Sequence, residues 1–276
     1  MKTFSKVEFY DRVLWKNYLA IIGIVGTIVT LISFFVTAED IDRFSAKQLA
    51  AFLVAGLVLI FAVMWYSANH RKHAVKMIIA ACGTVSSVVG DRPFVTDLPF
   101  TGVVLPAAET ACRITKNGKI GIIGTPATVR SGSYEKAIHK LRPEVAVISQ
   151  ACPLFVHLVE NGYTDFRNPV TRLVAEEYLE PVRKEGVDTL ILGCTHYPVI
   201  REVIADLMGP EVQLISSGAE AAKYARRCLE ARDLLSDRKE PGENTYYVSD
   251  STEMFIENAG HFLHQDVVGK VFRCSL

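Results

Sequence analysis

The sequence predicts an α/β fold made of two pseudo-symmetric parallel-sheet half-domains, the first incomplete, preceded by a two-helix transmembrane hairpin. Three observations support this prediction. Two long stretches without charge lie in the first quarter of the chain, and short apolar runs alternate with amphipathic stretches in the remainder. Two of those apolar runs also end in similar segments around a cysteine.

The composition sets the first limits on function. The chain has 276 residues and is 50% hydrophobic, which is ample for a packed core. Lys+Arg and Asp+Glu both total 30, so the net charge is +0 and no basic field points to a nucleic-acid partner. The 6 cysteines lack C-x-x-C spacing, and no H-E-x-x-H or phosphate-loop motif occurs, so neither a metal nor a nucleotide cofactor is expected.

Residues 1–74 are predicted to form the membrane hairpin. The runs 18–38 and 49–67 contain no charged residue, and each approaches the roughly 20 residues that a helix needs to cross a bilayer. Basic residues flank the pair on both sides, which predicts that both ends face the cytoplasm and that lipid of the inner membrane is a partner. The alternative is a pair of buried helices in a soluble protein.

After residue 73, apolar runs ending in Gly, Cys or Thr alternate with amphipathic stretches, which is typical of a parallel α/β sheet. The predicted strands cover residues 77–81, 101–105, 119–124, 145–149, 189–193, 213–216 and 245–248. The predicted helices begin near residues 86, 107, 127, 152, 170, 199, 218 and 251.

Two cysteines follow predicted strands in matching contexts. Cys82 follows MIIAA and precedes GTVSS, while Cys194 follows TLILG and precedes THYP. Ligands of α/β sheets bind beyond the carboxyl ends of the strands, where loops lead into helices. This internal echo predicts two similar half-domains whose cysteines face each other across a cleft.

Paired thiols in such positions suit proton transfer at carbon. A helix N-terminus stabilises a thiolate and lowers its pKa. Inverting a stereocentre requires a base on one face of the carbon and an acid on the other, with roles that reverse for the opposite enantiomer. Thr84, Thr195 and His196 lie within two residues of the thiols, where they can bind a carboxylate or assist proton transfer. The alternative is that both cysteines are small buried hydrophobes and His196 a core histidine.

From about residue 75 onward the chain resembles bacterial glutamate racemase. The resemblance rests on five segments in the family's order and spacing: IIAACGTVSS (78–87), GVVLPAAETA (102–111), IGIIGTPATVRSGSY (120–134), QACPLFVHLVENG (150–162) and LILGCTHYPVI (190–200). It implies a racemase-like region at 75–276, with a first half-domain of 75–105 plus 209–276 and a second of 106–208.

The resemblance also implies the chemistry. It implies an isomerase without pyridoxal that interconverts L- and D-glutamate for peptidoglycan synthesis, with Cys82, Cys194 and His196 as the catalytic residues. A homodimer is compatible with it. The residues implied to contact substrate are Gly83, Thr84, Thr125, Thr128, Thr195 and His196, with Glu160 near the cleft.

The sequence also departs from the family pattern. An Asp-Ser-Gly loop and a Pro-Tyr-Gly loop that grip the substrate in the family are absent, and the apolar hairpin stands in their place. Gly83 replaces a usual Asn. Two alternatives therefore stay open: a membrane-tethered, catalytically inactive binding or scaffold protein, and a fusion of unrelated pieces. Glutamate and aspartate are not distinguished either.

Overall fold

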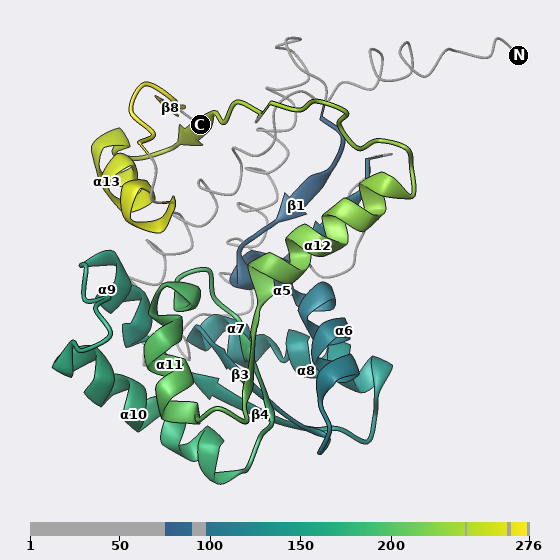
Figure 1. Ribbon diagram of the computed structural model, residues 1–276, viewed down its shortest axis with the longest axis vertical. Coiled ribbons are helices and arrows are strands. Elements are labelled where there is room, and N and C mark those ends of the chain that lie inside the picture. Colours follow the sequence, from purple (N-terminus) through teal and green to yellow (C-terminus); the bar gives the residue numbers. More distant parts are fainter. Residues whose placement is uncertain (1–74, 90–97, 241, 264–265, 275–276) are drawn as a thin grey trace, which may run out of the picture. The chain divides into compact units, whose positions relative to one another are not determined.

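The computed structural model describes residues 75–89, 98–240, 242–263 and 266–274, and these fall into two compact units (Figure 1). The larger unit contains the described residues between 79 and 228, apart from 98–100. The smaller unit contains 75–78, 98–100 and the described residues from 229 onward. The predicted hairpin helices, 18–38 and 49–67, lie outside the described residues. Within the described ranges, no helix combines the length and apolar character needed to cross a bilayer.

A four-stranded parallel sheet forms the centre of the larger unit. Its order is β4 (Ala146–Ala151), β3 (Lys119–Gly124), β5 (Thr189–Leu192) and β6 (Gln213–Ser216). The central strands β3 and β5 are almost wholly buried, as expected of a parallel sheet covered on both faces. Because the four strands are parallel, their carboxyl ends all lie at one edge of the sheet. At this edge the chain continues into the helices that carry the predicted site residues.

Helices cover both faces of this sheet (Figure 1). On one face, α6 (Val104–Ile114) and α8 (Ser133–Leu141) pack on Ile120 and Ile122 of β3. On the other face, α10 (Pro169–Lys184) packs so closely that a side chain at Gly121 would meet Val182. The remaining helical elements of this unit are α5 (Gly83–Val89), α7 (Pro126–Ser131), α9 (Leu154–Glu160), the 3-10 turn η1 (Tyr197–Ile200), α11 (Arg201–Met208) and most of α12 (Ser217–Glu230).

The predicted strand at 101–105 is wrong in its second half. The observed strand β2 is Phe100–Gly102, and it pairs with β1 (Ile78–Ala80). The chain turns at Val103, whose backbone N–H donates to Ser86 Oγ at 3.1 Å, and α6 begins one residue later. A short apolar run alone does not distinguish a strand from the first turn of a buried helix, which explains the error.

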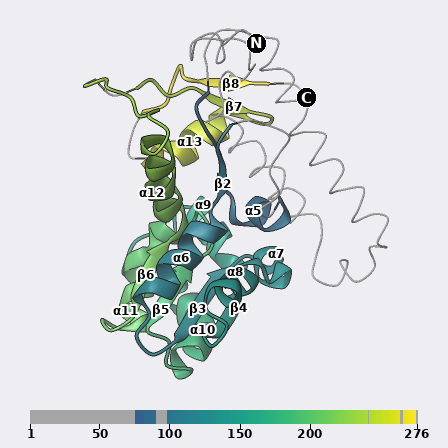
Figure 2. The ribbon, with the colours of Figure 1, turned by 90° about the vertical axis from the view of Figure 1, so that its right-hand side faces the viewer.

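The smaller unit contains a β-α-β arrangement that the sequence predicted only in part (Figure 2). Strand β7 (Tyr246–Val248) and helix α13 (Thr252–Leu263) match the predictions at 245–248 and 251. Strand β8 (Val271–Arg273), which was not predicted, pairs in parallel with β7. Tyr247 and Phe272 lie opposite each other with ring centroids 5.8 Å apart.

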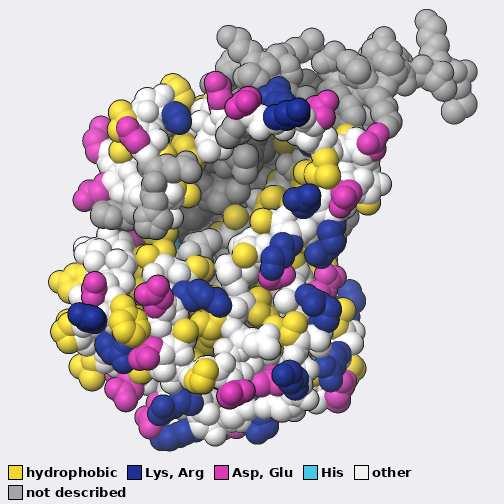
Figure 3. Space-filling model, in the orientation of Figure 1, with side chains coloured by type: hydrophobic (Ala, Val, Ile, Leu, Met, Phe, Trp, Pro, Cys, Tyr) yellow, Lys and Arg dark blue, Asp and Glu magenta, His cyan; other side chains and the backbone are white. Residues whose placement is uncertain are grey.

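The division into half-domains looks different in three dimensions. Residues 209–276 were assigned to the first half-domain, whereas β6 is hydrogen-bonded to β5, and the larger unit continues to Cys228. Strand β6 therefore extends the sheet that carries Cys194. On the face of the larger unit seen in Figure 3, basic and acidic side chains are interleaved, in keeping with the balanced charge.

Candidate active site

Cys82 lies between β1 and the first turn of α5. Its carbonyl oxygen accepts from the backbone N–H of Ser86 at 2.9 Å, which starts the helix one residue after the thiol. Burial, the largest cause, raises the pKa of Cys82, and the backbone N–H of Val85 lowers it only in part. The predicted lowering of this thiol's pKa is therefore wrong, because desolvation outweighs the helix N-terminus.

Cys194 occupies the corresponding place after β5. The backbone N–H of Gly193 donates to the carbonyl of Ile123 at 2.8 Å, so the strand pairing continues up to the residue before the thiol. Cys194 itself is buried, with 8% exposure. The chain then turns through Thr195 and His196 into η1, a 3-10 turn, before α11 begins.

His196 joins Cys194 to an acidic residue from another helix. Its Nδ1 lies 3.6 Å from Cys194 Sγ, and its Nε2 lies 2.9 Å from Oε1 of Glu160, the last residue of α9. Burial by itself lowers the pKa of His196, but the hydrogen bonds with Cys194 and Glu160 outweigh burial and raise it to about 9. At neutral pH the imidazolium therefore stabilises negative charge on the sulfur beside it.

Three threonine hydroxyls gather on the Cys82 side. Thr84 Oγ1 lies 3.1 Å from Thr125 Oγ1 and 3.3 Å from Thr128 Oγ1, and the latter two are 3.1 Å apart. Thr125 is also the N-cap of α7, since its hydroxyl accepts from the backbone N–H of Thr128. Hydroxyl groups both donate and accept, so this cluster can bind the carboxylate or amine of a small amino acid.

Two glycines bring the cysteines together. A Cβ atom at Gly83 would collide with the carbonyl oxygen of Gly193, so the residue after Cys82 touches the residue before Cys194. Negative charge on Cys194 is one of the smaller causes that raise the pKa of Cys82. The structure thus brings together the predicted catalytic residues and places the threonine cluster beside them.

The Asp/Glu/Hydantoin racemase family matches residues 58–225, which is more than half of the chain. The chain belongs to the Asp/Glu racemase family. The match begins inside the predicted second membrane helix and before residue 75, where the resemblance was expected to begin.

Curated and solved racemases agree with this assignment. The chain is 39% identical to the glutamate racemase of Geobacter metallireducens over 86% of its own length and 81% of the relative's. It is 44% identical to that of Chlorobaculum tepidum, covering 67% and 68%. Its fold matches a Bacillus anthracis glutamate racemase with a TM-score of 0.70 at 31% identity, covering 79% of each chain. A Francisella tularensis glutamate racemase solved with D-glutamate gives 0.62 at 32% identity, covering 73% of each.

Within this racemase fold, sequence reasoning missed one residue near the thiols. Tyr134, the second residue of α8, is 2% exposed, and its ring packs against Gly193. It lies at the end of the segment IGIIGTPATVRSGSY, but a tyrosine at a helix start carries no signal of its own. Cys152 is fully buried, and its Sγ donates to the carbonyl of Gln150 at 3.8 Å.

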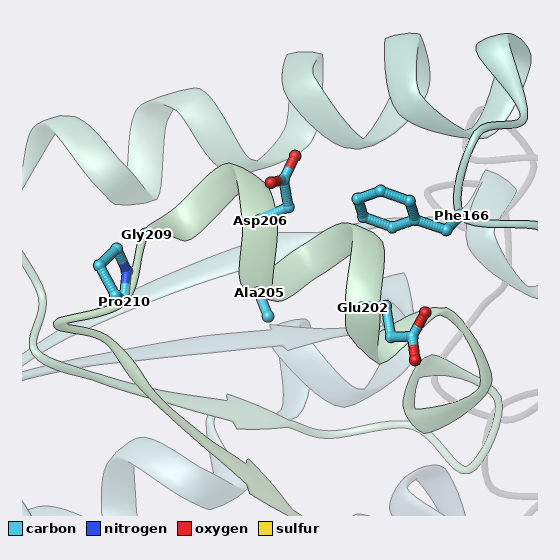
Figure 4. Close-up of a pocket in the computed structure, with 6 residues that line it drawn as sticks. All are labelled: Phe166, Glu202, Ala205, Asp206, Gly209 and Pro210. Atoms are coloured by element: carbon cyan, nitrogen blue, oxygen red, sulfur yellow. The ribbon is translucent and has the colours of Figure 1, made fainter.

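A separate surface hollow lies along α11 (Figure 4). It is lined by Phe166, Glu202, Ala205, Asp206, Gly209 and Pro210. Its Asp206 carboxylate accepts from Arg172 at 2.7 Å. None of the predicted site residues lines this hollow, so it is distinct from the paired cysteines.

Proposed function

We propose that this chain is a cofactor-independent glutamate racemase that supplies D-glutamate for peptidoglycan synthesis. The observation that carries the proposal is the meeting of the Cys82 and Cys194 segments at the Gly83–Gly193 contact. Relatives that are 39–44% identical are named glutamate racemases, which favours glutamate over aspartate as the substrate.

The geometry supports a two-base mechanism. One cysteine acts as a thiolate and takes the α-proton, which leaves a carbanion, and the opposing thiol donates its proton to the other face of the carbon. The α-carboxylate accepts hydrogen bonds from the Thr84, Thr125 and Thr128 hydroxyls. The Cys194 thiolate is stabilised by the His196 imidazolium, which Glu160 holds in place. Roles reverse for the opposite enantiomer, so no external cofactor is needed to complete the cycle.

A second part of the proposal concerns location. We propose that residues 18–38 and 49–67 anchor the enzyme in the inner membrane with the racemase region in the cytoplasm, because both runs are uncharged and flanked by basic residues. Fractionation of cells followed by carbonate extraction tests this. The full chain should stay in the membrane pellet, and its release into the soluble fraction would contradict the anchor.

The activity is tested on the purified full chain in detergent without added pyridoxal phosphate. We expect the circular-dichroism signal of L-glutamate and of D-glutamate to decay to the same zero endpoint, because enantiomers have equal free energies. The Cys82→Ala/Cys194→Ala double variant is the control and should leave both signals unchanged. A folded wild-type protein that leaves both signals unchanged would support the inactive scaffold. Decay with aspartate alone would change the substrate assignment.

Light scattering of the same preparation tests the homodimer, which is compatible with the family resemblance. A mass of two chains is the expected result. A monomer with full activity would remove that part of the proposal.

A further inference from the structure

Two buried serine hydroxyls bind the ends of the strands that lead to the two cysteines. Ser86 and Ser217 are the only serines buried among the described residues, with 4% and 3% exposure. The Ser86 hydroxyl donates to the carbonyl of Ala80 at 2.7 Å, and the Ser217 hydroxyl donates to the carbonyl of Leu192 at 2.8 Å. Ala80 is the last residue of β1, and Leu192 is the last residue of β5. Each hydrogen bond therefore holds the carbonyl two residues before a predicted catalytic thiol.

The end of the neighbouring strand β3, which is not followed by a thiol, is held differently. Its last residue is Gly124, whose carbonyl accepts from the backbone N–H of Cys152 at 2.9 Å. At β5, the pairing with β6 ends at Leu192 and Ser216. The donor to the Leu192 carbonyl is then a side chain, that of Ser217, the first residue of α12. A residue from another element thus fixes the end of the strand that leads to the thiol.

Ser86 holds three backbone groups around Cys82. Its own backbone N–H donates to the carbonyl of Cys82 at 2.9 Å. Its hydroxyl donates to Ala80 and accepts from the backbone N–H of Val103 at 3.1 Å. A Cβ atom at Gly102 would be 2.9 Å from this hydroxyl, so the end of β2 packs directly on it. Ser86 therefore fixes the chain on both sides of the thiol.

The position of each sulfur depends on the carbonyl that its serine holds. Only one residue, Ala81 or Gly193, separates the carbonyl from the cysteine. A strand-end carbonyl that loses its donor must move to find another, because an unpaired backbone group in a protein interior is unfavourable. A hydroxyl has one proton, and in both serines a backbone carbonyl accepts it, so neither serine is a proton donor for the substrate.

We infer that Ser86 and Ser217 are positioning residues, one for each face of the substrate carbon. Ser86 fixes the end of β1 and so the Cys82 sulfur, and Ser217 fixes the end of β5 and so the Cys194 sulfur. This inference rests on the proposed racemase function, in which the two sulfurs stay opposed across one carbon. Each serine therefore controls proton transfer at its own face and not at the other.

The Ser86→Ala and Ser217→Ala variants of the full chain each remove one of these hydroxyls. A misplacement of about 1 Å costs roughly 10²-fold in rate, and we expect the smaller shift caused by one lost hydrogen bond to lower kcat about tenfold. KM should stay unchanged, because neither hydroxyl binds the substrate in the proposed mechanism.

Exchange of the α-hydrogen in deuterated water, followed by NMR, distinguishes the two faces. An enzyme with a misplaced Cys82 still forms the carbanion with Cys194, but Cys194 then returns a deuteron more often than Cys82 completes the inversion. For the enantiomer that still exchanges in Cys82→Ala, Ser86→Ala should raise the ratio of exchange with retention to inversion about tenfold. Ser217→Ala should raise this ratio for the opposite enantiomer only.

Thr171→Val is the matched control. The Thr171 hydroxyl is fully buried in the same unit and donates to a backbone carbonyl, that of Tyr163, at 2.7 Å. Tyr163 lies between α9 and α10 and not at the end of a strand. Removing this hydroxyl should change neither kcat nor the exchange ratio of either enantiomer.

Alkylation by iodoacetamide, read by mass spectrometry of the Cys82 and Cys194 peptides, tests the same roles without any turnover. Loss of one neutral hydrogen bond should make local opening of a strand end about fivefold more frequent. Ser86→Ala should therefore speed the alkylation of Cys82 and leave that of Cys194 unchanged. Ser217→Ala should do the reverse.

The outcomes separate this inference from the proposed function. Should the wild type fail to racemise glutamate while each serine variant still speeds the alkylation of its own cysteine alone, the function fails and the positioning roles stand. With an active wild type, exchange ratios that rise for the same enantiomer in both variants, or for neither, would overturn the inference alone. A serine variant that does not fold would also overturn it, because the hydroxyl would then support the whole core.

Discussion

The two cysteine sites occupy equivalent places but are equipped differently. Each thiol follows a strand and precedes a helical turn. Cys194 has a charged neighbour, His196, which is held by Glu160 at 2.9 Å. Cys82 instead has uncharged neighbours, the Thr84 hydroxyl and the backbone N–H of Val85, and burial raises its pKa. The two strand ends thus share the position of a thiol but not the groups that control its proton.

The difference between the two cysteine sites can be observed only in some kinetic quantities. Enantiomers have equal free energies, so kcat/KM must be the same in both directions for any active variant. A difference between the Cys82 and Cys194 sides therefore appears in the separate kcat and KM values, or in half-reactions that stop at the carbanion. The predictions below address those quantities, beginning with the largest effect.

Replacing either cysteine should have the largest effect. We expect Cys82→Ala and Cys194→Ala each to lose racemisation by roughly 10³-fold or more, because a positioned acid or base contributes 10²–10⁴. In deuterated water, each variant should still exchange the α-hydrogen of one enantiomer, and the two variants should act on opposite enantiomers. NMR of the α-proton measures this. Exchange of the same enantiomer by both variants would contradict opposed thiols.

The Gly83–Gly193 contact should come next. Gly83→Ala places a Cβ against a backbone carbonyl, so α5 must move away from the Cys194 segment. A displacement of about 1 Å at a reacting centre costs roughly 10²-fold in rate, and we expect a loss of that order. The control is Gly218→Ala in α12, where the added Cβ meets nothing within 4 Å. Gly218→Ala should keep full activity. Equal losses of activity in both variants would show that the Gly83–Gly193 contact is not the cause of the loss.

Glu160→Gln tests the Cys194 site, whose neighbour His196 is charged. His196 has a pKa of about 9 when folded, against an ordinary value of 6.5, so its stabilising contribution is complete below 6.5 and is lost as the pH rises through about 9. Loss of the Glu160 charge should lower the pKa of His196 and reduce kcat about tenfold at neutral pH. Urea unfolding across this pH window should show the stability difference from wild type shrinking as the pH rises. A constant difference would mean that Glu160 does not act through His196.

Thr84→Val should have the smallest effect, on the uncharged side. Removing one hydroxyl of the threonine cluster should raise KM about fivefold, the size of one neutral hydrogen bond, with less change in kcat. The control is Thr171→Val in α10, which loses a hydrogen bond to the carbonyl of Tyr163. Thr171→Val should lower the free energy of unfolding by the contribution of one neutral hydrogen bond and leave KM unchanged. A fall in kcat with unchanged KM in Thr84→Val would instead indicate that the Thr84 hydroxyl acts on the Cys82 thiol and does not bind the substrate.

The accuracy of the predictions from sequence depended on how local each signal was. Strands 119–124 and 213–216 match β3 and β6 residue for residue, because their apolar runs are bounded by turn residues. The strand at 101–105 was wrong in its second half because the chain is turned at Val103 by Ser86, which lies 17 positions away in the sequence. Likewise, Glu160 and His196 are 36 positions apart, so their hydrogen bond leaves no trace in the spacing.

The sequence by itself determined the alternation of strands and helices, the place of each thiol at a strand end and the resemblance to a racemase, since these depend on local residue patterns. The tertiary structure decided which groups meet and how their protons are held. Burial raises the pKa of Cys82 against the helix N-terminus, and hydrogen bonds with Cys194, which follows β5, and with Glu160 of α9 raise that of His196. Desolvation and hydrogen bonding depend on every neighbour in space, and most of those neighbours are distant in the chain.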